Sequence, residues 1–271
     1  MTQLLVRDWE KDVVYLVQIP RAGAIPSLSP FCFKLETWLR MAGIKYHNVS
    51  NDFTHVSYKG QIPFIELNGR QIADSDHIIM ELTKIFNVEL DKNLTPLEWA
   101  NSIAYHHLIE HGILWGNLYF KSINNNFMAT PDGVINHFTG FKKFIFKSFI
   151  LGQRRRSFAA KCKAQGIGLD TPAEVEATLK NQIKALSTFM GESKFLIKDV
   201  PTTVDAVCFS ALCHFYYLPI NKMIKNYIDE QENLVDYMRR MKEEFWSDWN
   251  EATTNLSLQT KPKNKNIQNG D

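Results

Sequence analysis

The sequence predicts a two-domain protein, with a small α/β unit followed by an all-helical unit. Short apolar strands alternate with amphipathic helices only as far as Val88, and beyond that residue the patterns are almost entirely helical. The chain has 271 residues, enough for two domains of the usual size of about 100 to 150 residues. We therefore expect an N-terminal extension at residues 1–12, the α/β domain at 13–88, the helical domain at 95–251 and a disordered tail at 252–271.

The first domain is expected to follow the order β-α-β-β-β-α. The apolar run 13–17 suits a buried strand, and a turn containing Pro20, Gly23 and Pro26 closes it. Asn68-Gly69 is a strong hairpin signal between two further strands. The remaining elements are a helix whose apolar face holds Phe31, Leu35, Trp38, Leu39 and Ala42, a weak strand at 46–49 and a last helix that starts at Asp74-Ser75-Asp76.

Capping boxes mark the helices of the second domain. Thr95, Thr171 and Thr202 each precede an acidic residue by three positions, which is the pattern of a helix N-terminus. The most apolar stretch, 206–220, is shorter than the roughly 20 residues that cross a bilayer, so we expect a buried helix there. Beyond Thr253 the chain has no aromatic residue and is rich in Asn, Lys, Gln and Thr, which predicts the disordered tail.

Charge and cysteine content narrow the class of protein. The 31 basic and 29 acidic residues give a net charge of +2, too small to indicate nucleic acid as a partner. The first 20 residues lack the pattern of a signal peptide, and four cysteines without zinc-finger spacing indicate a reducing compartment. We expect a cytoplasmic protein with no metal, because the pair His107 and His111 has neither a catalytic Glu nor a third ligand.

Three motifs and the order of the elements resemble a known family. They are Ser29-Pro30-Phe31-Cys32 with the helix that follows, Ile62-Pro63-Phe64-Ile65-Glu66-Leu67-Asn68-Gly69, and Ile72-Ala73-Asp74-Ser75-Asp76. Together they are similar to the failed axon connections, cadmium-responsive and metaxin-like group of glutathione S-transferase-fold proteins. The resemblance runs from about Val13 to Glu251 and includes the aromatic C-terminal helix near Trp246. It implies a thioredoxin-like N-terminal domain and a transferase-type helical C-terminal domain.

The resemblance also implies a glutathione site. Ser29 would be the catalytic hydroxyl that stabilises the glutathione thiolate, the backbone around Ile62 and Pro63 would bind the cysteinyl part, and Asp74 with Ser75 would hold the γ-glutamyl end. A helix N-terminus favours such an anion. Each residue also has a structural interpretation, since Ser29 and Asp74 are ordinary N-cap residues and Pro63 can serve only to turn the strand.

Two further features of this region are open. Cys32 resembles the second cysteine of a glutaredoxin motif whose first cysteine is Ser29 here, so disulfide exchange is disfavoured and a buried thiol is expected. A pocket for an apolar electrophile is expected between the domains, although most of its candidates could equally be core residues. Those candidates are Tyr105, His106, His107, His111, Trp115 and Tyr119.

Two functions follow as hypotheses. The first is a transferase that binds glutathione as co-substrate and conjugates it to a small apolar electrophile, in detoxification or a cadmium-type stress response, with a homodimer allowed. The alternative is a non-catalytic adaptor in axon development or at the periphery of an organelle membrane. The adaptor would use a basic amphipathic helix at 134–163, which has no acidic residue and could contact a membrane surface or a protein. The structural alternative is that this helix only packs its apolar side against the core and exposes its basic side to water.

Overall fold

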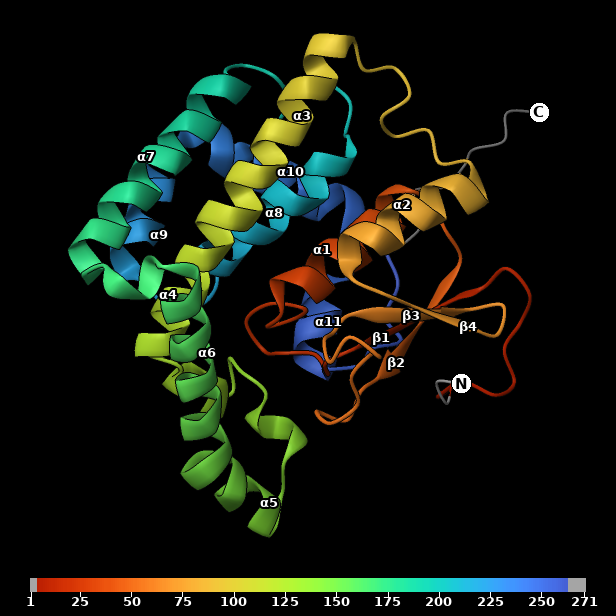
Figure 1. The fold of residues 1–271 in the computed structure, drawn as a ribbon, viewed down its shortest axis with the longest axis vertical. Helices are drawn as coiled ribbons and strands as arrows, with labels where there is room; N and C mark the ends of the chain where they lie inside the picture. Colours follow the sequence, from red (N-terminus) through yellow and green to blue (C-terminus); the bar gives the residue numbers. More distant parts are fainter. Residues whose placement is uncertain (1–3, 263–271) are drawn as a thin grey trace.

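A four-stranded mixed sheet forms the N-terminal domain of the computed structural model, which describes residues 4–262 (Figure 1). The strand order is β2-β1-β3-β4, with β1 parallel to β2 and antiparallel to β3, and β3 antiparallel to β4. The predicted order of strands and helices is confirmed, and it is that of a thioredoxin-like domain. The elements are β1 (Val14–Gln18), α1 (Pro30–Met41), β2 (Tyr46–Ser50), β3 (Phe64–Leu67), β4 (Arg70–Ala73) and α2 (Ser75–Phe86).

The rest of the described chain is mainly helical, and its helices α8 and α10 pack against α1. Helix α8 is buried along almost its whole length, and its Ser210 hydroxyl donates to the carbonyl of Pro30 at the start of α1. No helix among residues 4–262 is long and apolar enough to span a bilayer. The helices are α3 (Pro96–Leu108), a π-turn (Ile109–Ile113), α4 (Leu114–Ile123), α5 (Gly140–Ile145), a π-turn (Phe146–Ile150), α6 (Leu151–Gln165), α7 (Pro172–Met190), α8 (Thr203–Tyr216), α9 (Lys222–Asp229), α10 (Glu232–Phe245) and α11 (Trp249–Asn255), with short 3-10 turns at Asn126–Ala129, Ile135–His137 and Ile167–Leu169.

The predicted helix starts are explained by side-chain caps. The Thr95 and Thr171 side chains each accept from the backbone N–H three residues on, and the Glu at that position accepts from the backbone N–H of its threonine. The basic helix, however, begins at Gly140 and not at residue 134, because Phe138 and Thr139 have extended backbone and separate it from a 3-10 turn.

A cluster of buried charges joins α1 of the N-terminal domain to Asp248 of the C-terminal domain. Glu36 of α1 accepts two hydrogen bonds from Arg21, at 2.6 and 2.7 Å, and its Oε1 lies 3.2 Å from Arg40. Arg40 also contacts Asp248 at 2.6 Å, and all four side chains are at most 2% exposed. Burial alone would raise the pKa of Glu36, but the two guanidinium groups hold it well below its usual range. The group as a whole is neutral, which makes its burial tolerable.

The prediction of a disordered tail is wrong for residues 252–262. Residues up to Asn255 belong to α11, and the chain then runs beside the edge strand β2. There the Asn48 amide donates to the carbonyl of Leu258 at 2.8 Å, and the Lys261 ammonium donates to the carbonyl of Tyr46 at 2.7 Å. The segment is held by polar contacts to the edge strand, so its lack of aromatic residues misled the prediction. The remainder of the predicted tail, 263–271, lies outside the described residues.

Substitution Glu36→Gln should lower the free energy of unfolding by about 3 to 5 kcal/mol, because it leaves buried guanidinium groups without full compensation. Urea unfolding followed by far-UV circular dichroism measures this loss. A matched control is Glu243→Gln, because Glu243 pairs with Arg239 on the exposed face of α10 and exposed pairs contribute little. A Glu36→Gln variant as stable as the control would contradict the role given to this cluster.

Candidate functional site

Ser29 lies at the junction of the first strand region and the first helix. It is the N-cap of α1, and its Oγ accepts from the backbone N–H of Cys32 at 3.3 Å. The side chain is only partly buried, and Pro30 occupies the first helical position. The hydroxyl therefore caps the helix and remains within reach of a ligand at the same N-terminus.

The peptide bond Ile62–Pro63 is cis, at the start of β3. The pairing of Phe64 with Ala73 in the neighbouring strand places Pro63 beside Asp74. Phe64 also pairs with Val17, near the end of β1 from which the chain leads to Ser29. The two strand pairings thus place the predicted cysteinyl-binding segment between the N-terminal regions of α1 and α2.

Asp74 is the N-cap of α2 and has an unusual backbone conformation. Its φ of 83° lies in the left-handed region that non-glycine residues rarely adopt. Its Oδ1 accepts from the backbone N–H groups of Asp76 and His77, at 3.1 and 3.3 Å. Ser75, which follows it, is buried with 7% of its surface exposed. Capping accounts for the Asp74 side chain, and the helix N-terminus is suited to a carboxylate ligand.

An ion pair holds these two helix N-termini together. Lys34 lies five residues after Ser29 on α1, and Asp76 directly follows Ser75 on α2. The Lys34 Nζ lies 2.7 Å from Oδ1 of Asp76. The predicted residues Ser29, Ile62, Pro63, Asp74 and Ser75 are therefore brought to one region by the sheet register and by this contact.

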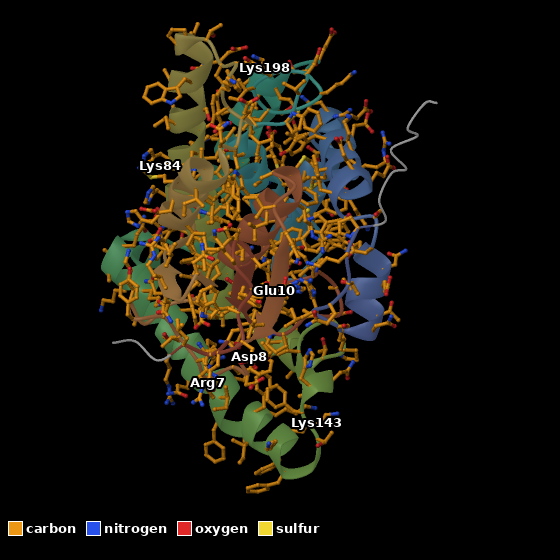
Figure 2. The ribbon with its side chains drawn as sticks, turned by 90° about the vertical axis from the view of Figure 1, so that its right-hand side faces the viewer. Arg7, Asp8, Glu10, Lys84, Lys143 and Lys198 are labelled. Carbon is orange, nitrogen blue, oxygen red and sulfur yellow. The ribbon has the colours of Figure 1, made fainter. Side chains whose placement is uncertain are left out.

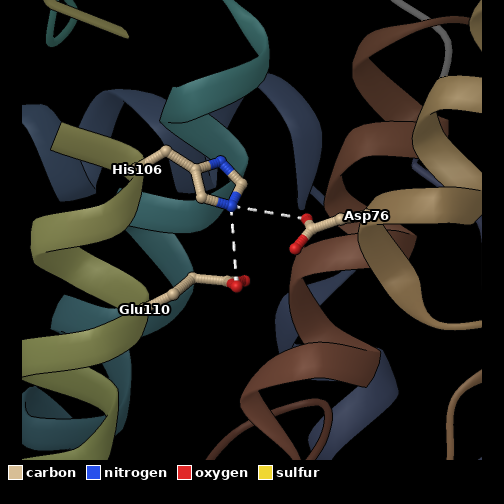
Figure 3. A group of neighbouring side chains, drawn as sticks. All are labelled: Asp76, His106 and Glu110. Atoms are coloured by element: carbon tan, nitrogen blue, oxygen red, sulfur yellow. Dashed lines mark ion pairs between the residues drawn. The ribbon is translucent and has the colours of Figure 1, made fainter. Parts of the chain in front are cut away.

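The same lysine belongs to a charged quartet between the domains, which we define as Lys34, Asp76, His106 and Glu110. Figure 3 shows the last three of these side chains. Lys34 pairs with Glu110 as well as with Asp76, and its side chain is fully buried. His106 Nε2 lies 3.4 Å from Asp76 Oδ1 and 3.5 Å from Glu110 Oε2. With His106 protonated, two cations balance two carboxylates.

The quartet resembles a metal site in composition but not in charge. One ligand atom from each of Asp76, His106 and Glu110 lies within 4.8 Å of the others. The Lys34 ammonium, however, already bonds both carboxylates and supplies the positive charge that a divalent ion would bring. A metal would have to displace this buried cation, so we assign none to the quartet.

The carboxylates of the quartet control the ionisation of His106. Burial alone would lower its pKa, but the contacts with Asp76 and Glu110 outweigh burial and raise the pKa to about 9. The pKa of Asp76 would likewise be raised by burial, but His106 and Lys34 lower it well below its usual range. His106 is therefore charged at neutral pH.

The sequence did not indicate the quartet as a unit. From the sequence alone His106 is only a pocket candidate, and Asp76 is only part of a helix start. The available signal was Lys34, which falls among Phe31, Leu35 and Trp38 on the apolar face of α1 and so had to be buried with a partner.

Cys32 is a buried thiol, as expected. It is fully inaccessible to solvent, and burial raises its pKa to about 11 despite a hydrogen bond with Ser29. A thiol that stays protonated at neutral pH is a poor nucleophile. Cys32 therefore packs within the first turn of α1 rather than serving as a reactive group.

Most of the predicted pocket candidates do not face a common pocket. Tyr105 stacks on Phe189 of α7 with ring centroids 4.1 Å apart, and the Tyr119 hydroxyl donates to the carbonyl of Asp170. Trp115 packs against the core of the helical domain, and His107 stacks on the exposed His111. Of the six, His106 reaches across to the N-terminal domain, where it contacts charges rather than apolar side chains.

Two surface cavities lie near the N-terminal domain. One, of about 800 Å³, is lined by the C-terminal end of α1 and by residues 86–94 and 198–201. The other, of about 380 Å³, is lined by Tyr58, Lys59, β4 and the exposed side of α2. Neither of these two cavities includes Ser29, Ile62 or Asp74 in its lining.

Substitution His106→Gln should destabilise the protein most at pH 6 and progressively less as the pH approaches 9.5. A group with a raised folded pKa stabilises the fold fully below its unfolded pKa of about 6.5, and this contribution is lost as the pH rises through about 9. The expected difference at pH 6 is about 3 kcal/mol at most, measured by urea unfolding of both proteins at each pH. A difference that does not change with pH would show that His106 is not paired with the carboxylates.

Comparison with known families agrees with this geometry. The glutathione S-transferase N-terminal domain model matches residues 30–127, and the C-terminal domain model matches residues 179–241. The structure superimposes on human glutathione S-transferase T1-1 with a TM-score of 0.55 at 12% identity, covering 92% of each chain. The fold is therefore that of the transferases.

Several curated proteins are similar over most of the chain. Failed axon connections of Drosophila melanogaster is 37% identical over 93% of this chain, which spans only 62% of that longer protein. Isoprene-epoxide–glutathione S-transferase of Rhodococcus is 26% identical over 83% of this chain and 95% of its own length. The mitochondrial outer membrane import complex protein metaxin of Arabidopsis thaliana is 23% identical over 88% of this chain and 74% of its own. The chain belongs to the group of glutathione S-transferase-fold proteins that includes failed axon connections and the metaxins.

Proposed function

We propose that this protein is a non-catalytic adaptor built on the glutathione S-transferase fold. The observation that carries the proposal is the charged quartet. Conjugation would need an apolar electrophile site beside Ser29 and between the domains, whereas there Lys34 is paired with Asp76 and Glu110. An apolar substrate at this place would cover the parts of the Asp76 and His106 side chains that remain in water, 39% and 21% exposed, without replacing that hydration, which is costly.

Two of the relatives support a role other than conjugation. One is named for axon connections and another for a mitochondrial outer membrane import complex. By this proposal the chain acts in the cytoplasm, or at the periphery of an organelle membrane, by presenting surfaces to partners. The segment 134–163 is one such surface. A homodimer could use another, because Met80, Ile85, Leu97, Trp99 and Ile103 of α2 and α3 are exposed.

A second candidate function is glutathione binding with conjugation, and one specific arrangement favours it. Ser29 caps α1, the Ile62–Pro63 bond is cis, and Asp74 with Ser75 begins α2, and these features are compatible with the expected glutathione site. In this role Ser29 would stabilise the thiolate, the backbone at Ile62 would bind the cysteinyl part, and Asp74 with Ser75 would bind the γ-glutamyl end. A small electrophile would be the co-substrate, in detoxification or a cadmium-type stress response, and a relative named as an isoprene-epoxide transferase is consistent with this.

The conjugation rate separates the two functions. The adaptor proposal expects the wild type to accelerate the reaction of reduced glutathione with 1-chloro-2,4-dinitrobenzene or an epoxide no more than Ser29→Ala does. The control variant Ser29→Thr keeps both the hydroxyl and the helix cap. Loss of the cap in Ser29→Ala costs about 1 kcal/mol of stability, so circular dichroism first establishes that each protein is folded.

A rate for the wild type and Ser29→Thr at least about tenfold above that of Ser29→Ala would overturn the adaptor proposal. Calorimetric titration with reduced glutathione then tests the site itself. Saturable binding that Asp74→Ala weakens, without turnover, would support an adaptor that keeps glutathione as a ligand.

A further inference from the structure

The charge of the chain is concentrated in one segment. Between Gly133 and Leu169 there are eight basic residues and no acidic residue. The rest of the chain holds 23 basic and 29 acidic residues, a net charge of −6. Positive and negative charges are therefore unevenly distributed in the chain, although its net charge is only +2. A negatively charged surface would attract this basic segment and repel the rest of the molecule.

The same segment exposes three large aromatic side chains. Phe141, Phe144 and Phe149 are 74%, 58% and 66% exposed, and the rings of the first two are stacked. By contrast, Phe138 and Phe146 stack on each other at 4.6 Å and face the protein. The helix is thus anchored on one side and leaves three phenyl groups in water on the other, where they gain nothing for the fold.

Lys142, Lys143 and Lys147 alternate with these phenyl groups, and Arg154, Arg155 and Arg156 follow one to two turns later. All six are exposed, and none forms an ion pair with another residue of the described range 4–262. We call residues 140–156 the basic–aromatic tip. It forms one end of the long axis of the molecule, with α5 at the bottom of Figure 1, and Figure 2 shows Lys143 at that end and Lys198 at the other.

We propose that the basic–aromatic tip docks the protein on an anionic lipid bilayer. The lysines and arginines bind the negatively charged headgroups, and Phe141, Phe144 and Phe149 enter the boundary between headgroups and acyl chains. Basic side chains that alternate with exposed phenyl groups at one end of the molecule fit a surface that has anionic headgroups above an apolar layer. This attachment rests on the proposed adaptor function, whose membrane contact it specifies, and it does not depend on whether glutathione is conjugated.

The test is co-sedimentation of the full chain with vesicles, either of phosphatidylcholine alone or with about 30% phosphatidylserine. We expect binding to the anionic vesicles that falls with rising salt. Each lysine near the surface is worth about fivefold in affinity, so the triple variant K142Q/K143Q/K147Q should bind roughly a hundredfold more weakly. The variant F141A/F144A/F149A keeps every charge and should weaken binding by about tenfold or more.

A matched control removes three exposed lysines elsewhere, in K84Q/K184Q/K222Q. Lys84 lies on α2, well away from Lys143 in Figure 2. The control should bind like the wild type, because screening limits each charge to about 8 Å at physiological salt. Circular dichroism establishes that all variants are folded.

The proposal is overturned if neutral and anionic vesicles bind equally, if neither binds, if the control variant loses as much affinity as the tip variant, or if the phenylalanine variant binds like the wild type. An acidic protein as the true partner would appear as the absence of vesicle binding.

Discussion

The hydrogen-bonded pair of Arg21 and Glu36 is the contact on which the arrangement of both domains depends. Both side chains are fully buried, so the Glu36 carboxylate has no water to solvate it. Further hydrogen bonds to Glu36 replace that water, and their donors are Gln18, Tyr46 and Asn48 of the sheet and Arg40 of α1. Arg40 extends the cluster to Asp248 and lies 3.5 Å over the ring of Trp246, at the end of the helical domain. Strands, first helix and C-terminal segment are thereby fixed with respect to one another.

Helix α1 carries a second neutral set of charges on another side. Lys34 joins it to α2 through Asp76 and to the helical domain through Glu110, with His106 beside both carboxylates. The two sets leave α1 little freedom to shift or rotate, and so they hold Ser29 and the start of α2 in place. The arrangement is compatible with the proposed glutathione site at Ser29, Ile62 and Asp74, and it places the charges of the quartet between the domains.

Local signals were sufficient to predict the order of strands and helices, because turns and caps are short-range features, whereas the fold class was implied by the family resemblance. Thr95, Thr171 and the Asn68-Gly69 turn each specify their structure within a few residues. The quartet could not be predicted in the same way, since Glu110 is 76 residues from Lys34 and only tertiary packing brings them together. The order of residues 252–262 could not be predicted for a similar reason. Asn48 and Tyr46, which are far away in the sequence, supply the hydrogen-bond partners that hold this segment in place.

Calorimetric comparison of reduced glutathione with S-hexylglutathione tests the central claim most directly, because the hexyl chain probes the space between the domains. A transferase with an apolar electrophile site gains about 0.8 kcal/mol for each methylene that it buries, and so prefers the hexyl compound strongly. The quartet of Lys34, Asp76, His106 and Glu110 predicts no such preference, whether both compounds bind alike or neither binds. A more than tenfold tighter binding of S-hexylglutathione would contradict the account.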